Sequence, residues 1–345
     1  MIDLRSDIMN TPTEEMWEAM RNAKLGRVTA REDPSVNKLE EMAAKLMGKE
    51  AAILVLTGRM ANLVALMTYC ERGHQVILEK DSHIIWVEEW GLAYVCGLYP
   101  RLLKGNAGVM DPADIETAIT ESKFNNCPTT DLVCLENTHN MAGGTVLTVR
   151  QTEELCSVAH RDGARVFIDG ARIFHAAAAL GVKPAELAAP ADAVAICMVK
   201  GLSGPGGALL CGSNKDIEKA YINLRRIGGA AFHRAGIIAA GDIVALETMV
   251  DRLCDDNKRA KEFAKALYQI EGVVIDFSSV QTNIVMADIS ASGLSGKEFL
   301  RHLQQRGVMA IQCTPEIVRF TFHRHITDKD VLTTVEAIKE VMRGK

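Results

Sequence analysis

Six short apolar runs, separated by segments of helical periodicity, constrain the fold of the first 215 or so residues. The runs are AAILVLT, HQVILE, DLVCLE, ARVFID, DAVAICMV and GALLCG. They are apolar at nearly every position, which is typical of strands buried on both faces of a sheet. The intervening segments, such as MANLVALMTYC and VRQTEELCSVAHRDG, have the apolar spacing of helices. The sequence therefore predicts an α/β domain with a mostly parallel sheet covered by helices.

The character of the chain changes after a long helical stretch from about Ala235 to Leu267, which could link two domains. Beyond it, VVIDF, TNIVMAD, VMAIQC and IVRFTFH predict strands, while GKEFLRHLQQRG and residues 328–342 predict helices. This pattern indicates a small α+β domain, for which an antiparallel sheet is one arrangement. We expect a large domain at residues 1–248 and a small C-terminal domain at residues 249–345.

Composition and charge argue against nucleic acid, membranes and metal ions as binding partners of this chain. The formal net charge of -5 gives no broad basic surface for nucleic acid or an anionic membrane. No charged leader precedes an apolar run, and no apolar window is long enough to span a bilayer. The nine cysteines are scattered singly, without the C-x-x-C spacing of a metal site. We therefore expect a cytoplasmic protein with reduced cysteines, no metal, no membrane span and no nucleic acid partner.

Asp169 and Lys200 each end an apolar run, in VFIDGAR and AICMVKG. Open α/β sheets place ligands at such strand ends. A carboxylate and an amine there match the needs of pyridoxal phosphate (PLP), because the acid keeps the pyridine nitrogen protonated and the lysine forms an imine. Taken alone, an Asp and a Lys at strand ends are also compatible with an ordinary sheet edge.

The segment LTGRMAN, residues 56–62, follows an apolar run and opens a helix. Backbone N–H groups at a helix start, with the Thr57 hydroxyl and the charge of Arg59, form a natural phosphate site. An ordinary strand-to-helix turn is the other interpretation. His83, in DSHIIW, could stack on a flat ring or could simply be a packed or surface residue.

Six motifs in order resemble the threonine aldolase family of fold-type I PLP enzymes, which is grouped with the β-eliminating lyases. They are MIDLRSD, REDPSVNKLEEMAAKLMGKEAAI, TGRMAN, LENTHNMAGG, the DGARIF run and the CMVKGL run, and EIVRFTFH extends the resemblance to the C-terminal part. The resemblance covers essentially the whole chain. It implies the fold-type I architecture, with an aspartate-aminotransferase-like large domain.

The resemblance also assigns residues to the cofactor. It implies that Lys200 is the Schiff-base lysine, that Asp169 pairs with the pyridine nitrogen and that His83 stacks on the ring. The phosphate site falls at three consecutive residues, Thr57, Gly58 and Arg59.

The family's substrate site and subunit contacts map onto further residues. Ser6, Arg172 and Arg319 fall where the family holds the substrate carboxylate and the ring-hydroxyl side, and Glu88 matches an acidic residue near the reaction centre. The family forms homodimers or homotetramers with shared active sites. Arg226 and His233 fall where a neighbouring subunit reaches the phosphate; all of these positions are read from the motifs.

This chain departs from the family pattern at several positions. Arg59 stands where a small hydroxyl residue is usual, Val199 where a serine precedes the lysine, and His233 where an arginine is usual. On the substrate side, Ala30 and Arg31 replace a tyrosine and a glycine. Asn126 matches a histidine implicated in aldol chemistry, and Trp90 fills the place of a small residue.

The resemblance implies retro-aldol cleavage of a β-hydroxy-α-amino acid, of the L-threonine or L-allo-threonine type, to glycine and an aldehyde. Lys200 would exchange its imine for that of the substrate, and His83, or Glu88 through water, would take the β-hydroxyl proton. Because the substrate side differs, two alternatives remain. One is β-elimination or racemisation of a small amino acid, with Lys200 carrying the proton; the other is a PLP-binding homologue without turnover.

Overall fold

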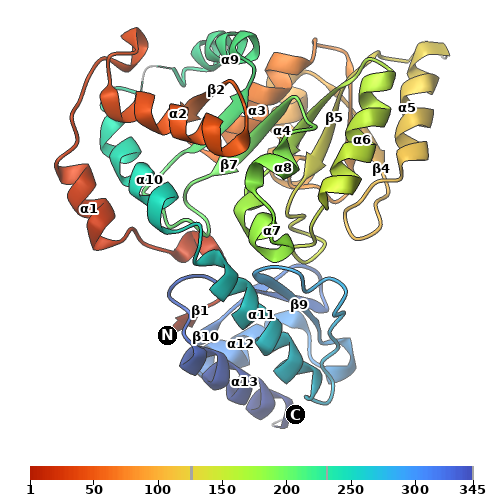
Figure 1. The fold of residues 1–345 in the computed structure, drawn as a ribbon. Helices are drawn as coiled ribbons and strands as arrows, with labels where there is room; N and C mark the ends of the chain where they lie inside the picture. The colour runs from red at the N-terminus through yellow and green to blue at the C-terminus, as the bar shows by residue number, and fades with distance from the viewer. Residues whose placement is uncertain (125–126, 231, 344–345) are drawn as a thin grey trace.

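All six apolar runs form strands of one seven-stranded sheet in the computed structural model (Figure 1). The structure describes residues 1–124, 127–230 and 232–343, without the side chains of residues 87–90. The strands follow the order β2-β8-β7-β6-β5-β3-β4, and β8 alone runs antiparallel to its neighbours. Their bounds are β2 Ala51–Val55, β3 Gln75–Glu79, β4 Tyr99–Leu103, β5 Thr130–Glu136, β6 Arg165–Asp169, β7 Ala193–Cys197 and β8 Ala208–Gly212.

Helices cover both faces of this sheet. In β6, Val166 and Ile168 pack into the core on one face and Phe167 into the core on the other, as the continuous apolar run requires. The first face carries α2 Pro34–Met47, α5 Pro112–Phe124, α6 Val149–Arg161, α7 Ile173–Leu180, α8 Pro184–Ala188 and α10 Gly236–Thr248. The second carries α3 Gly58–Tyr69, α4 His83–Gly91 and α9 Asn214–Arg226. The prediction of an α/β domain with a mostly parallel sheet is confirmed.

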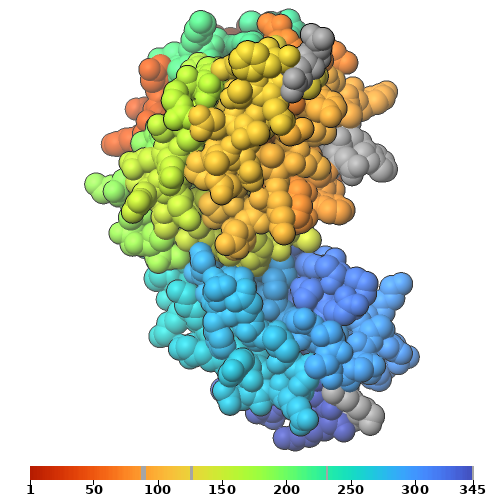
Figure 2. Space-filling model, turned by 90° about the vertical axis from the view of Figure 1, so that its right-hand side faces the viewer, coloured from red at the N-terminus to blue at the C-terminus, as the bar shows by residue number. Residues whose placement is uncertain are grey.

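The C-terminal residues form a small α+β lobe. Figure 2 shows a narrowing of the molecule between this lobe, in blue, and the large lobe that contains the seven-stranded sheet. Its three-stranded antiparallel sheet has the order β11-β12-β9. The strands are β9 Ile284–Asp288, β10 Val308–Met309, β11 Ile311–Gln312 and β12 Ile317–Thr321, with helices α11 Leu253–Tyr268, α12 Gly296–Gln305 and α13 Asp328–Arg343. The boundary at residues 248 and 249 stays a prediction.

Two predicted elements differ from the structure. The helical stretch from Ala235 to Leu267 is interrupted after Thr248, and a second helix, α11, starts at Leu253 (Figure 1). The run VVIDF forms no strand; within it only Val274 makes an isolated bridge, to Asp288. Val274 is also more than half exposed, so this segment is not a fully buried run.

The N-terminus lies on the small lobe (Figure 1). Strand β1, Ile2–Asp3, pairs in parallel with β10, and Leu4 is buried in the small-lobe core. The chain then crosses to the large lobe, where α1, Glu14–Arg21, packs on α10. None of the described helices is long and apolar enough to cross a membrane.

Candidate active site

Polar residues follow the carboxyl ends of five strands that run in the same direction. Thr57 follows β2, His83 follows β3, Asn140 follows β5, Arg172 follows β6 and Lys200 follows β7. Because parallel strands end at one edge of a sheet, these residues gather at that edge, where open α/β sheets bind ligands.

A cavity of about 440 Å³ lies at this edge, against residues of the small lobe. Nine of the predicted site residues line it: Ser6, Thr57, Gly58, Arg59, His83, Asp169, Arg172, Lys200 and Arg319. Ser6 follows β1 and Arg319 lies in β12, so both lobes contribute to the wall.

Lys200 lies on a tight turn after β7. The carbonyl oxygen of Lys200 accepts the Ser203 N–H at 2.9 Å and the Asn10 side-chain amide at 3.0 Å. Gly201 is required here, because a Cβ would lie 2.3 Å from Nε2 of His175. Ser203 has a φ of 56°, a strained conformation that fixed surroundings must maintain. The turn therefore holds the start of the lysine side chain in one place.

Asp169 is buried at the end of β6. One of its oxygens accepts the Asn62 side-chain amide at 2.9 Å, and the other accepts the Ala171 N–H at 3.1 Å. These two donors fix the orientation of the carboxylate at the cavity floor, and each oxygen keeps a lone pair for a ligand.

The start of α3 offers an anion site. Thr57 is the N-cap, and its hydroxyl accepts the Met60 N–H at 3.1 Å. The first N–H groups of the helix have no intrahelical acceptor, and with the helix dipole they favour a negative group. Arg59, on the first turn, adds a full positive charge beside the same cavity.

His83 is the first residue of α4 and faces the cavity. Burial lowers the pKa of His83 to about 4, and the nearby cations Lys200 and Arg172 act in the same direction, while Asp169 opposes them. The imidazole is therefore neutral at pH 7, which suits it both to stack on a ring and to accept a proton.

This pKa predicts a pH dependence of stability that His83→Phe should remove. The cofactor-free folded chain favours the neutral ring, so the unfolded chain gains the proton first as the pH falls through 6.5. We expect the free energy of unfolding to decline by up to about 3 kcal/mol between pH 6.5 and pH 4 because of this group. Urea unfolding of the wild-type protein and of His83→Phe at several pH values measures this decline. If the free energy of unfolding fell equally with pH in both proteins, the lowered pKa of His83 would be contradicted.

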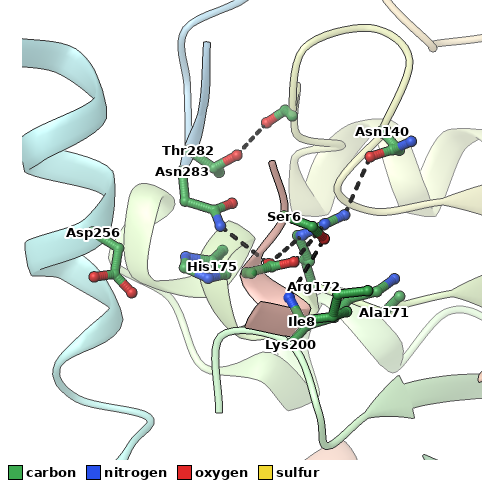
Figure 3. A network of polar contacts seen from close by, with 12 residues as sticks. Ser6, Ile8, Asn140, Ala171, Arg172, His175, Lys200, Asp256, Thr282 and Asn283 are labelled. Atoms are coloured by element: carbon green, nitrogen blue, oxygen red, sulfur yellow. Dashed lines mark hydrogen bonds and ion pairs between the residues drawn. The ribbon is translucent and has the colours of Figure 1, made fainter. Parts of the chain in front are cut away.

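Arg172 is a buried cation with a buried partner. Its Nε and Nη2 donate to the two oxygens of Asp7, at 2.6 and 2.7 Å, across 165 positions of sequence (Figure 3). Burial alone would raise the pKa of Asp7, but Arg172 holds that pKa well below its usual range. Asn283, on the small lobe, donates to the same carboxylate at 3.2 Å. The guanidinium is thereby fixed with one edge toward the cavity.

Asn140 joins two arginines. Its side-chain oxygen accepts Nη1 of Arg319 at 3.0 Å and lies 3.4 Å from Nη1 of Arg172. Nε of Arg319 is buried and has no hydrogen-bond partner among the described residues. Two guanidinium groups thus converge on one part of the cavity, an arrangement suited to a carboxylate ligand.

Other predicted residues are not part of this cavity wall. Arg226 ends α9, where its Nη1 donates to Asn223 at 2.9 Å, and His233 is exposed on the loop before α10. Glu88 lies in α4, but its side chain and that of Trp90 lie outside the described residues, as does Asn126 entirely.

Four residues of this region were not among the predicted site residues: Asp7, Asn62, Glu136 and Asn140. Each nevertheless lies inside a motif that the resemblance used, namely MIDLRSD, TGRMAN and LENTHNMAGG. Their position in those motifs was the only available signal, because their partners lie far away in sequence.

Two kinds of comparison show the family, and a third shows the fold. A family model described as "Beta-eliminating lyase" matches residues 3–291. The chain is 38% identical to low-specificity L-threonine aldolase 1 of Arabidopsis thaliana, over 99% of this chain and 96% of that protein. The solved structure of Leishmania major threonine aldolase covers 99% of this chain and 100% of its own, with a TM-score of 0.85 at 18% identity, a likeness of fold.

A more distant relative has a different named activity. Alanine racemase TOXG of Cochliobolus carbonum is 27% identical over 99% of this chain and 88% of that protein. Residues common to these proteins therefore fit more than one reaction.

Proposed function

The chain belongs to the β-eliminating lyase family and is an enzyme of the lyase class, and on this basis we propose that it is a PLP-dependent aldolase. The proposed reaction cleaves a β-hydroxy-α-amino acid, of the L-threonine or L-allo-threonine type, into glycine and an aldehyde. The observation that carries the proposal is one cavity lined by an amine, a buried carboxylate, a helix N-terminus and two convergent arginines.

The lining residues fit PLP. Lys200 supplies the amine for the aldehyde group, Asp169 supplies a fixed carboxylate for the pyridine nitrogen, and the start of α3 with Arg59 supplies donors for the phosphate. PLP, when bound, acts as an electron sink for a bond to Cα of the amino acid. The chain's own part is to bind, orient and move protons.

The amino-acid carboxylate is assigned to Arg319 and Arg172, with Ser6 beside them. Nη1 of Arg319 donates to Asn140 and Nη2 to the Arg5 carbonyl, and each nitrogen keeps a second N–H that can donate to a carboxylate in the cavity. Fixing the carboxylate there orients the amino acid in the cavity, and so selects which bond of Cα is presented for cleavage.

A proton must leave the β-hydroxyl group as the Cα–Cβ bond breaks. His83 is assigned this role because it faces the cavity and its ring is neutral at pH 7, so that a ring nitrogen can accept a proton. Glu88, five residues further along α4, is the other candidate base and would act through water.

Incubation of the PLP-loaded protein with L-threonine, L-allo-threonine and phenylserine tests the proposal. We expect glycine together with acetaldehyde or benzaldehyde in equal amounts. Absence of glycine and aldehyde from all three substrates would contradict the aldolase proposal.

The alternative is chemistry that begins with loss of the Cα proton, with Lys200 as the proton carrier. The racemase relative favours it, because that protein aligns over nearly the whole chain. Pyruvate and ammonia released from serine would support elimination, and D-alanine formed from L-alanine would support racemisation. Either product, without aldehyde from the aldol substrates, would replace the first proposal.

Arg319→Lys should weaken substrate binding more than it slows turnover. Lysine keeps the charge but lacks the planar guanidinium, so one hydrogen bond to the substrate carboxylate is lost. A hydrogen bond to a charged group contributes about 1.5–3 kcal/mol. We expect KM for the amino acid to rise about 10- to 100-fold with a much smaller change in kcat. Steady-state kinetics measure both. The exposed Arg301→Lys is the matched control, and an unchanged KM in R319K would remove Arg319 from the substrate site.

We further propose a cytoplasmic homodimer or homotetramer with shared active sites. Arg226 and His233 are exposed in the single chain and lie outside its cavity wall, which suits the role of reaching the phosphate of a neighbouring subunit. Arg226→Ala and His233→Ala should therefore weaken PLP affinity without changing the fold of the subunit.

A further inference from the structure

Glu136, the last residue of β5, connects two parts of the active-site wall without lining the cavity itself. Its side chain is buried, and its carboxylate accepts two backbone N–H groups: one oxygen accepts from His83 at 2.6 Å and the other from Asn140 at 2.8 Å. His83 and Asn140 both line the cavity, and they follow adjacent strands, β3 and β5. One carboxylate therefore holds the two adjacent loops together.

A buried row of polar groups fixes Glu136 from behind. Nε2 of His139 lies 3.9 Å from Glu136 and 3.1 Å from Glu79, while the Ala142 N–H donates to Nδ1 at 3.2 Å. Glu79 in turn accepts backbone N–H groups of Asp81, at 2.6 Å, and Gly105, at 3.0 Å. Burial opposes the charged form of His139, but the two carboxylates more than compensate and raise its pKa. The imidazole thus ties both glutamates into one network.

The Asn140 end of this network reaches the arginines. The backbone of Asn140 is held by Glu136. Its side-chain oxygen is the shared acceptor of Arg319 and Arg172, and Figure 3 shows the contact with Arg172. The same turn is also attached to the small lobe, because the Thr282 hydroxyl donates to the Gly144 carbonyl at 2.6 Å. A shift of Asn140 would therefore move the acceptor between the two guanidinium groups.

We propose that Glu136 is a positioning residue that sets the separation between His83 and the Asn140–arginine group, and hence between the cofactor ring and the substrate carboxylate. The inference rests on the proposed function, since it assigns His83 to the ring and the arginines to the carboxylate. Glu136 touches neither ligand. It acts through the two N–H groups that its oxygens hold in place.

Glu136→Gln tests this role with nearly the same volume. An amide has one acceptor oxygen, and its NH₂ group cannot accept, so one of the two backbone N–H groups loses its partner. Small misplacements in an active site can cost about 100-fold in rate. We expect a rise in KM and a fall in kcat of about 10-fold each, together with an altered visible circular dichroism of bound PLP.

Glu40→Gln is the matched control. Glu40 is a partly buried glutamate that also accepts a backbone N–H, that of Leu54 at 2.9 Å, but it lies outside the active-site cavity. We expect E40Q to keep wild-type KM, kcat and dichroism, whatever its stability. Equal changes in both variants would assign the effect to general destabilisation and overturn the proposal.

Asn140→Ala supplies a test that does not depend on the folding of E136Q. It removes the side-chain acceptor of the arginines and leaves the backbone N–H on Glu136. We expect KM to rise about 10-fold, as for loss of one hydrogen bond to a charged group, with wild-type dichroism of the cofactor. An unchanged KM in N140A would overturn the link from Glu136 to the arginines.

The outcomes separate the two proposals. A wild-type protein that takes up no PLP contradicts the proposed function and the inference with it. A wild-type protein that binds PLP and turns over substrate, beside a folded E136Q with unaltered KM, kcat and dichroism, overturns the inference alone.

Discussion

Lys200→Ala is expected to abolish covalent attachment of the cofactor and to lower kcat by about 10⁴-fold, the upper end of what a positioned proton-transfer group contributes. The structure holds the backbone of Lys200 by hydrogen bonds from Ser203 and Asn10, so the truncated turn should keep its shape. Borohydride treatment followed by peptide mass analysis measures the attachment, because it fixes PLP on the chain only where an amine holds it.

The matched control is Lys38→Ala, which removes an exposed lysine paired with Glu247 at 3.2 Å. It should leave labelling and kcat at wild-type levels. Labelling of K200A at wild-type stoichiometry, or on another lysine of the wild-type chain, would refute the assignment of Lys200.

Asp7→Asn is expected to destabilise the fold by about 3–5 kcal/mol, the cost of removing one partner from a buried ion pair. Arg172 would keep a buried charge, with one neutral amide in place of a carboxylate that accepts two of its N–H groups. The guanidinium would also lose its fixed orientation toward the cavity, so KM for the amino acid should rise. Urea unfolding and steady-state kinetics measure the two effects.

Asp3→Asn is the control for Asp7→Asn, because Asp3 pairs with Arg5 in the same N-terminal segment but at a partly exposed site. Such a pair contributes about 1 kcal/mol or less. The depressed pKa of Asp7 sets the sign of its pH dependence: its stabilisation is present above the unfolded value of about 3.9 and is lost as the pH falls toward the folded pKa. Equal losses in D7N and D3N would contradict the special role of the buried pair.

The sheet was predictable because its strands are buried on both faces, so each appears as an apolar run. Strand β4 was missed for the opposite reason. It is the edge strand of the sheet, Tyr99 is half exposed, and Pro100 can occupy only an edge position. The break between α10 and α11 carries no Gly or Pro; it lies in the segment 249–252, so periodicity alone predicted one helix.

The candidate site was predictable where a residue follows a strand end or matches a family motif. Lys200 and Asp169 satisfy both conditions, and the structure brings them to one cavity. Asp7 and Asn140 are different, because they act by accepting hydrogen bonds from Arg172 and Arg319, which lie up to 179 positions away in the sequence. No local pattern encodes such a pairing, so only the fold reveals it.

The pairing of β1 with β10 makes the two ends of the chain depend on each other during folding. Residues 2–3 find their partners only at 308–309, a contact of very high sequence separation that forms late when a chain is made from its N-terminus. Ser6 and Asp7 follow this strand directly. The large lobe can therefore be complete while its catalytic cavity is not, and an arrested or truncated chain that lacks the last 40 or so residues should be compact, yet inactive.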